Sequence, residues 1–480
     1  MGGAGRDRPG PAGRGALIPT PVSLATAVPV PGAAVARLVR DRVASRTAAR
    51  GTGQAAPGWV DAPQRARPLA GHVAGLAAEL AADGVTRTLL VTAGAVGLNA
   101  AALVPGEPRL RVLDTPDAGR VADALEGDLD ATVLVVAVPP GVDRAGIDAV
   151  TALVQDAMRA EGVDVAARTI AVVPPGTPAP EAATVIEGPA DVHHAWTAFT
   201  PYALVPAGLT GADLHALLDA ADAGRAHDGE DDPALRLGAL LAGAAPDGAA
   251  PTGATATPTG VVLDGLGDAH VQLVTALAGP VPVQPPVWEP VLRVGTDGPD
   301  STGGTGSGER PEPYVHLGGS PAGVLHLLQW AVAAAGHLLG RDPTAPAERD
   351  TALPPLAFVD GAVDVHAGDW LPPGTAGVGD ALLALLATGP GPVALHAQLD
   401  PELDASVAVL RERLARRTGR PTTFTWAPGV PPAGALTVQL TGDVVEDGPA
   451  PPGPGRDGLR LHLHDRLAGL VVLARAVQDL

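Results

Sequence analysis

The sequence predicts an α/β protein made of two doubly wound, parallel-sheet subdomains in tandem, with helices around them. Short, continuous apolar runs alternate along the chain with segments of helical periodicity, a pattern typical of parallel strands that are covered on both faces. The chain has 480 residues, more than one hydrophobic core usually serves, and 46% of them are hydrophobic. Two α/β units in succession agree with the chain length and with the hydrophobic content.

The first half of the chain supplies the first unit. Residues 72–83 place Val73, Leu76 and Leu80 at helical spacing. A second helical segment is predicted at residues 145–160. Four apolar runs predict strands, at residues 88–92, 111–114, 132–138 and 169–173.

The second half repeats the alternation of strands and helices. Helices are predicted at residues 321–339 and 378–387 and at the end of the chain, and a helix predicted at residues 212–221 precedes this half. Strands are predicted at residues 356–359, 392–398, 422–426, 436–440 and 459–464.

One further helix is expected after Asp400 and Pro401, because aspartate caps helices and proline is tolerated at their first position. Gly419 would end this helix. Its apolar stripe would consist of Leu403, Val407, Leu410 and Leu414.

Composition suggests four parts of the chain. Residues 1–55 are expected to be an N-terminal tail and lead-in segment, partly disordered, because their start is rich in Gly, Pro and Arg. Residues 56–225 would form the first α/β domain and residues 346–480 the second. Between them, residues 226–345 would connect the domains and contain a flexible Gly-rich loop at residues 295–313.

Composition also excludes several classes of protein. The chain contains neither Cys nor Lys, which excludes disulfide scaffolds, thiolate sites and the usual P-loop. Its net charge is −20 and only 2% of residues are aromatic, which argues against nucleic-acid partners. It shows neither a long uninterrupted apolar stretch nor the apolar core of a secretory signal. We therefore expect a cytoplasmic protein without membrane contact.

The candidate binding residues lie in two turns. Doubly wound sheets bind ligands beyond the carboxyl ends of their strands, which here are the turns at residues 93–98 and 138–144. Gly94 and Gly141 belong to these turns, and Arg144 is the cation that could hold an anion. His193 and His194, next to Trp196, are a replacement acid/base pair, the edge of a metal site, or an ordinary pair of surface or loop residues.

A set of landmarks appears in order over roughly residues 70–478. Residues 89–98, 112–117 and 132–141 would be the first strands and turns, and a Trp-Thr-Ala-Phe segment begins at Trp196. Further landmarks are residues 203–209, 235–239, 329–330 and 333–340. Together these segments resemble the glucose-6-phosphate isomerase family, in its longer bacterial form with two sugar-isomerase (SIS) domains. The resemblance implies SIS-type subdomains, a homodimer, and a place in carbohydrate metabolism (glycolysis and gluconeogenesis).

The phosphate loop of that family is rich in Ser and Thr around a glycine, but this chain departs from the pattern. Residues 137–144 read Ala-Val-Pro-Pro-Gly-Val-Asp-Arg, and only Gly141 fits. Two prolines remove amide donors, and Asp143 would repel a phosphate.

The positions of the family's catalytic residues differ as well. The arginine position of the family falls at Ala195, and the glutamate that follows the tryptophan of the long helix is Ala331. Thr275 and Ala276 stand where the general-base glutamate is expected, and the C-terminal lysine of the family is missing from a Lys-free chain.

We therefore favour a catalytically degenerate homologue of glucose-6-phosphate isomerase that binds a sugar phosphate, another small anion or a protein. This hypothesis requires neither a cofactor nor a metal. One alternative is an active isomerase that uses substituted residues, namely His193, His194, Arg144 or Glu289. The other alternative is a structural or assembly protein whose cleft has closed.

Overall fold

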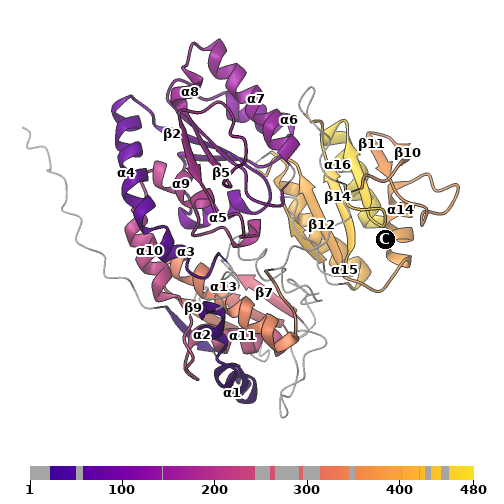
Figure 1. The fold of residues 1–480 in the computed structure, drawn as a ribbon. Helices are drawn as coiled ribbons and strands as arrows, with labels where there is room; N and C mark the ends of the chain where they lie inside the picture. Colours follow the sequence, from indigo (N-terminus) through magenta and orange to yellow (C-terminus); the bar gives the residue numbers. More distant parts are fainter. Residues whose placement is uncertain are drawn as a thin grey trace, which may run out of the picture.

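The computed structural model of the chain describes residues 22–26, 28–49, 58–142, 144–243, 260–264, 291–295, 314–344, 352–401, 403–420, 422–426, 434–444 and 453–480. Three sheets with helices packed on them make up this part of the molecule (Figure 1). The start of the predicted N-terminal tail, residues 1–21, and the predicted loop beyond Gly295 lie outside the described residues, so their flexibility stays a prediction.

The N-terminal sheet has five parallel strands in the order β3-β2-β4-β5-β6. The strand order reverses between β2 and β4, which makes this pair the topological switch point of the sheet. The strands are β2 (Arg87–Val91), β3 (Leu110–Leu113), β4 (Thr132–Ala137), β5 (Thr169–Val173) and β6 (Thr184–Glu187).

Both faces of the N-terminal sheet are apolar, and each belongs to a different hydrophobic core. Leu90, Val135 and Val172 face α4 (Arg67–Ala82), α5 (Val96–Leu103) and α9 (Pro201–Leu209). Leu134 and Val136 face α6 (Ala118–Leu125), α7 (Arg144–Ala160) and α8 (Val165–Arg168). This sheet is doubly wound, as the sequence predicts.

A layer of helices extends the first of these cores. It contains α10 (Leu214–Ala223), α11 (Pro233–Gly243) and α13 (Pro321–Leu339), preceded in the chain by α1 (Gly32–Arg40), α2 (Val43–Ala49) and α3 (Ala62–Arg65). Three tryptophans meet in it: the ring of Trp59 lies 4.6 Å from that of Trp196 and 5.1 Å from that of Trp330. These large rings fill space that the many alanines leave.

Helix α13 begins and ends where the sequence predicts. Ser320 accepts a hydrogen bond from the N–H of Gly323, and Gly340 ends the helix in the left-handed conformation. By length and composition alone α13 could cross a membrane, but 78% of its most apolar window is buried inside the protein. Among the described residues it is a core helix.

A smaller sheet, which the sequence did not predict, joins the lead-in segment to the connecting region. Its order is β1-β9-β8-β7, and β1 runs antiparallel to β9. The strands are β1 (Ser23–Thr26), β7 (Gly260–Asp264), β8 (Val291–Gly295) and β9 (Tyr314–Gly318). Residues on either side of the first domain thus pair with each other.

The C-terminal sheet has six strands in the order β10-β11-β15-β14-β12-β13. Strands β13, β12, β14 and β15 are parallel, and they wind in the order seen for β3, β2, β4 and β5. The strands are β10 (Leu356–Asp360), β11 (Val363–His366), β12 (Val393–Gln398), β13 (Thr422–Thr425), β14 (Leu436–Thr441) and β15 (Leu459–Leu463).

The described helices of this domain lie on one face of its sheet. Helices α14 (Val378–Ala387), α15 (Val409–Thr418) and α16 (Arg466–Asp479) share a single core with Leu395, Leu440 and Leu461. The α/β class is confirmed, but this sheet differs from the expected doubly wound arrangement. Its predicted strand at residues 356–359 pairs antiparallel to β11 in a hairpin instead of following a helix crossover.

The helix expected directly after Asp400 begins later than predicted. The side chain of Asp400 accepts from the N–H of Leu403, but the chain then forms the short 3-10 helix η3 (Ala405–Ala408) before α15 starts. Val407, Leu410 and Leu414 are buried as expected, whereas Leu403 is 75% exposed and lies outside the stripe. Gly419 ends the helix with a left-handed backbone, as predicted.

Candidate functional site

The two glycine turns chosen from the sequence lie side by side at the switch point of the N-terminal sheet. The turn with Gly94 connects β2 to α5, and the turn with Gly141 connects β4 to α7. Between the two strand ends, the hydroxyl of Thr92 donates to the carbonyl of Ala137 at 2.8 Å. Both glycines have positive φ, +67° and +76°, which favours glycine at each position.

The turn with Gly94 is filled by a side chain of the protein itself. The N–H of Ala95, at the start of α5, donates to Nδ1 of His194 at 3.1 Å. A Cβ on Gly94 would lie 2.8 Å from the imidazole ring, so only glycine leaves room for it. The helix end that could have bound an anion is therefore capped by His194.

The backbone around His194 is held from α5 and α13. His194 begins the 3-10 helix η2 (His194–Trp196), and the buried side chain of Asn99 donates to the carbonyls of His194 and Ala195 and to the hydroxyl of Thr197. Gln329 reaches the carbonyl of Trp196. These bonds fix the position from which His194 enters the turn.

His193 lies against His194, with their ring centres 4.0 Å apart. Its Nδ1 accepts from the N–H of Ala195 at 3.5 Å, so His193 caps η2. Burial lowers the pKa of His193, because the charged imidazolium is disfavoured away from water. Its Nδ1 is thus engaged by the backbone of η2.

The turn with Gly141 is more open than the turn with Gly94. A Cβ on Gly141 would meet no atom within 4 Å. The guanidinium of Arg144 pairs with Asp148 at 2.9 Å and donates to the carbonyl of Pro178 at 2.7 Å. Its charge is thus balanced one helical turn further along α7.

The sequence-derived candidates are only partly brought together. Gly94, His193 and His194 meet in one cluster, and Gly141 belongs to the neighbouring turn. Arg144 starts α7 after that turn but is engaged by Asp148. Glu289 lies outside the described residues.

The end of β3 carries two aspartates that are also engaged. Asp114 pairs with Arg120 at 2.5 Å, and both side chains are largely buried. The same guanidinium donates to the carbonyl of Val112 at 2.8 Å. Asp117 caps α6 by accepting from the N–H of Arg120, and it also contacts Arg466 of the C-terminal domain.

Sequence reasoning missed a row of polar residues that runs across the C-terminal sheet. Cα registers place its members next to one another on five adjacent strands. We call them the polar row: Thr425, His396, Gln439, Arg460 and His366. They point away from the core that covers the other face, because side chains alternate along a strand.

Hydrogen bonds link the polar row and its neighbours. Nδ1 of His396 lies 2.8 Å from the hydroxyl of Thr425, and Arg460 donates from Nε to the hydroxyl of Thr441 at 3.2 Å. Burial lowers the pKa of the Arg460 guanidinium. Burial also lowers the pKa of His462, and the nearby charge of Arg460 adds to the effect. The alternation of apolar and polar residues in 393–398 and 436–441 is the signal that could have revealed this face.

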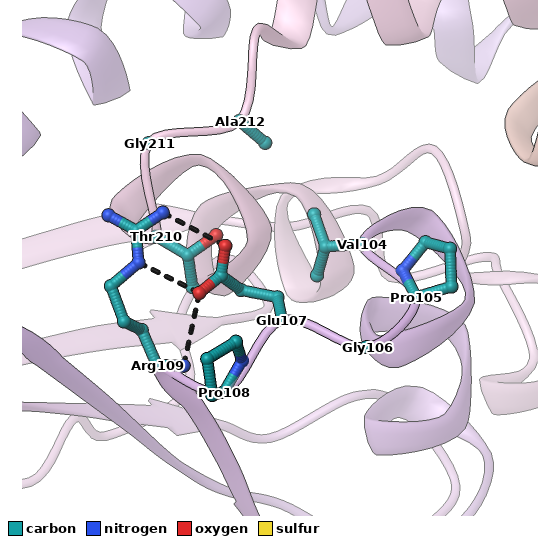
Figure 2. Close-up of a pocket in the computed structure, with 9 residues that line it drawn as sticks. All are labelled: Val104, Pro105, Gly106, Glu107, Pro108, Arg109, Thr210, Gly211 and Ala212. Atoms are coloured by element: carbon teal, nitrogen blue, oxygen red, sulfur yellow. Dashed lines mark hydrogen bonds and ion pairs between the residues drawn. The ribbon is translucent and has the colours of Figure 1, made fainter.

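A hollow of about 300 Å³ lies near the amino end of β3, opposite to the end where the glycine turns lie. It is lined by the loop before β3 and the loop before α10 (Figure 2). Glu107 and Arg109 form a two-pronged ion pair in it, with Nε–Oε1 and Nη2–Oε2 distances of 2.8 and 2.9 Å. Hydrogen bonds from Arg109 lower the pKa of Glu107 to about 2. The two charges in its lining satisfy each other, so this hollow offers little for catalysis.

The residues that the structure describes contain no group of three or more His, Asp or Glu side chains arranged to hold a metal ion. His462 and Asp443 come within 3.5 Å of each other, and so do His464 and Asp364. Each is a pair without a third potential ligand in the described part of the chain.

Comparison with known families and with curated proteins finds no match to this chain. Among solved structures it is similar to a glucose-6-phosphate isomerase from Chlamydia trachomatis, at 16% identity and a TM-score of 0.46 over 63% of this chain and 74% of that one. A hypothetical protein from Thermus thermophilus shows 18% identity and a TM-score of 0.46, over 68% and 97%. A protein classed as a phosphosugar isomerase from Silicibacter pomeroyi shows 18% identity and a TM-score of 0.35, over 63% and 99%.

Proposed function

We propose that this protein is a non-catalytic, divergent member of the sugar isomerase superfamily that binds a sugar phosphate or another small anion at the turn between β4 and α7. The observation that carries the proposal is the contrast between the two turns at the switch point. His194 fills the turn with Gly94, whereas the turn with Gly141 has room for at least a Cβ. Ligands of doubly wound sheets bind at such a point.

The side chains at the carboxyl ends of β2 and β4 support ligand binding more than proton transfer. General acid/base catalysis needs a group of suitable pKa within hydrogen-bond reach of the substrate. Nδ1 of His194 already accepts from the N–H of Ala95, and Nδ1 of His193 accepts from the N–H of Ala195 as the cap of η2. Arg144 is paired with Asp148.

Two positions where the resembled family carries charged catalytic residues support the same interpretation. Ala195 and Ala331 stand at these positions, and both are buried, at 3% and 0% exposure. Small apolar side chains packed in a core can neither bind a phosphate nor move a proton. Buried alanines at these two positions support binding without isomerase chemistry.

The proposal is tested by thermal unfolding in the presence of millimolar glucose 6-phosphate, fructose 6-phosphate or inorganic phosphate. A ligand at 100 times its Kd would stabilise the fold by about 2.7 kcal/mol. We expect the shift to be lost in G141A. The matched control is G162A. Gly162 has a similar φ of +82° and equal space for a Cβ, but it lies at the amino ends of the strands, away from the proposed site.

Three outcomes would overturn parts of the proposal. Equal loss of the shift in both variants would remove the assignment to Gly141. No shift with any of the three ligands would exclude an anion site. Turnover of fructose 6-phosphate, coupled to a dehydrogenase, would show an active isomerase, and variants of His193, His194 and Arg144 would then identify its residues.

A structural or assembly protein with a closed cleft is the second candidate. It is favoured by the contact of Arg466 with Asp117, which joins the ends of the two sheets. Under this function no sugar phosphate would stabilise the protein. We further propose, from the family resemblance alone, a cytoplasmic homodimer, which light scattering after size exclusion would test.

A further inference from the structure

One arginine of the C-terminal domain lies between carboxylates of both domains. Arg466, the first residue of α16, contacts Asp117 at the end of β3 through Nη2. Its Nη1 donates to Asp404 of its own domain at 3.1 Å. Figure 1 shows α6, which Asp117 caps, next to the C-terminal domain.

Few other described contacts join the two sheets at this point. The N–H of Ala118 donates to the carbonyl of Asp443 at 3.0 Å, and Asp117 forms an isolated antiparallel bridge with Val444. Asp443 and Val444 lie in the loop after β14, and Asp117 lies between β3 and α6. The carboxyl ends of both sheets therefore meet, and the guanidinium of Arg466 lies at the meeting point.

The burial of these groups makes the contact sensitive to change. The side chain of Asp117 is 1% exposed and that of Asp404 is 6% exposed, while Arg466 is 27% exposed. Neutralising Asp117 removes the charge attraction across the domain boundary, whereas Arg466 keeps Asp404 as a partner within its own domain.

We infer that the contact between Arg466 and Asp117 is a latch that holds the carboxyl ends of the two sheets together, so that the protein has a closed form and an open form. Asp404 orients Arg466 from within the C-terminal domain, whereas Asp117 is the partner across the domain boundary. The latch does not depend on the proposed ligand. The latch predicts that substitutions of Asp117 and Asp404 affect the distance between the domains differently, although both aspartates contact the same arginine.

The test compares D117N with D404N in a full-length chain that carries two spin labels. The chain contains no Cys, so E161C and R417C introduce two unique attachment sites at exposed positions of the two domains. Electron–electron double resonance then gives the distribution of distances between the domains. We expect D117N to raise the fraction of long distances about tenfold and D404N to leave it nearly unchanged.

Asparagine keeps the helix-capping capacity of position 117, so D117N should fold. Should D117N be unfolded by circular dichroism, R466K serves instead, because a lysine cannot span both carboxylates as the guanidinium fork does. R466K is expected to give the same longer distances. The inference fails when the folded variant shows the distances of the parent chain, or when D117N and D404N lengthen them equally.

Discussion

The N-terminal and C-terminal sheets wind their parallel strands in the same order but bury their faces differently. In the N-terminal sheet, Leu90 and Leu134 belong to two separate cores on opposite faces. In the C-terminal sheet, the core that contains Leu440 covers one face, and the polar row lies on the other. The same topology is therefore compatible with one or two apolar faces, and the strand sequences decide which occurs.

The largest loss of unfolding free energy should come from replacing core leucines on the apolar faces of the two sheets. L90A and L134A should each lower the free energy of unfolding by about 2–5 kcal/mol, because each leaves a cavity in a different core. L440A should cost a similar amount in the C-terminal sheet.

Thr437 serves as the comparison for Leu440, because it is buried on the polar face of the same strand. T437A should cost less than about 1.5 kcal/mol, since it removes little apolar area. Urea denaturation measures all four values. Equal costs for T437A and L440A would contradict a difference between the faces.

The second effect concerns the pH dependence of stability. His326 of α13 is fully buried, its Nδ1 lies 2.6 Å from the carbonyl of Ala221, and burial lowers its pKa to about 4 from an ordinary 6.5. The unfolded state therefore binds more protons between these values, so stability is complete above about pH 6.5 and falls as the pH drops toward 4. Linkage gives a total loss of about 3 kcal/mol.

Urea denaturation at pH 7 and pH 5 should show a smaller difference in H326Q than in the parent chain. H462Q is the comparison in the C-terminal sheet, where the pKa is also lowered but the side chain is 23% exposed. Its effect on the pH dependence should be smaller. An unchanged pH dependence in H326Q would show that His326 does not titrate as its burial predicts.

The third effect is local to the switch point. H194A removes the acceptor for the N–H of Ala95 and the ring that packs on Gly94, and it should cost about 1–2 kcal/mol. H464A, at a side chain 43% exposed next to the C-terminal sheet, should change stability by less than about 0.5 kcal/mol. Thermal unfolding compares them. Equal values would mean that the cap contributes nothing.

The smallest effect is expected at the hollow shown in Figure 2. E107Q breaks the ion pair with Arg109, but that guanidinium is about half exposed, so water and salt already weaken the attraction. We expect a change in unfolding free energy of less than about 0.5 kcal/mol by urea denaturation. A larger loss would give the hollow a structural importance that its exposure does not suggest.

Much of the fold was predictable because local patterns sufficed. The run at 132–138, which is apolar after Thr132, forms the central strand β4, and α13 spans the predicted residues 321–339. The candidate site was less predictable. Arg144 was chosen for its position beside Gly141, but it pairs with Asp148 one helical turn later. The sequence shows that such an i,i+4 pair can form, but not whether Arg144 binds Asp148 or an anion at the turn. The contact of Arg466 with Asp117 joins residues 349 positions apart and has no local signal.

The sequence by itself determined the alternation of strands and helices, the absence of Cys and Lys, and a stretch at residues 137–144 without Ser or Thr, because each can be read from the residue types and their order along the chain. Only the tertiary structure decided that His194 enters the turn of Gly94, that Arg144 turns to Asp148, and that the two sheets meet through Arg466. These are contacts between distant segments or choices among several partners, and they follow from packing and the need to satisfy buried polar groups.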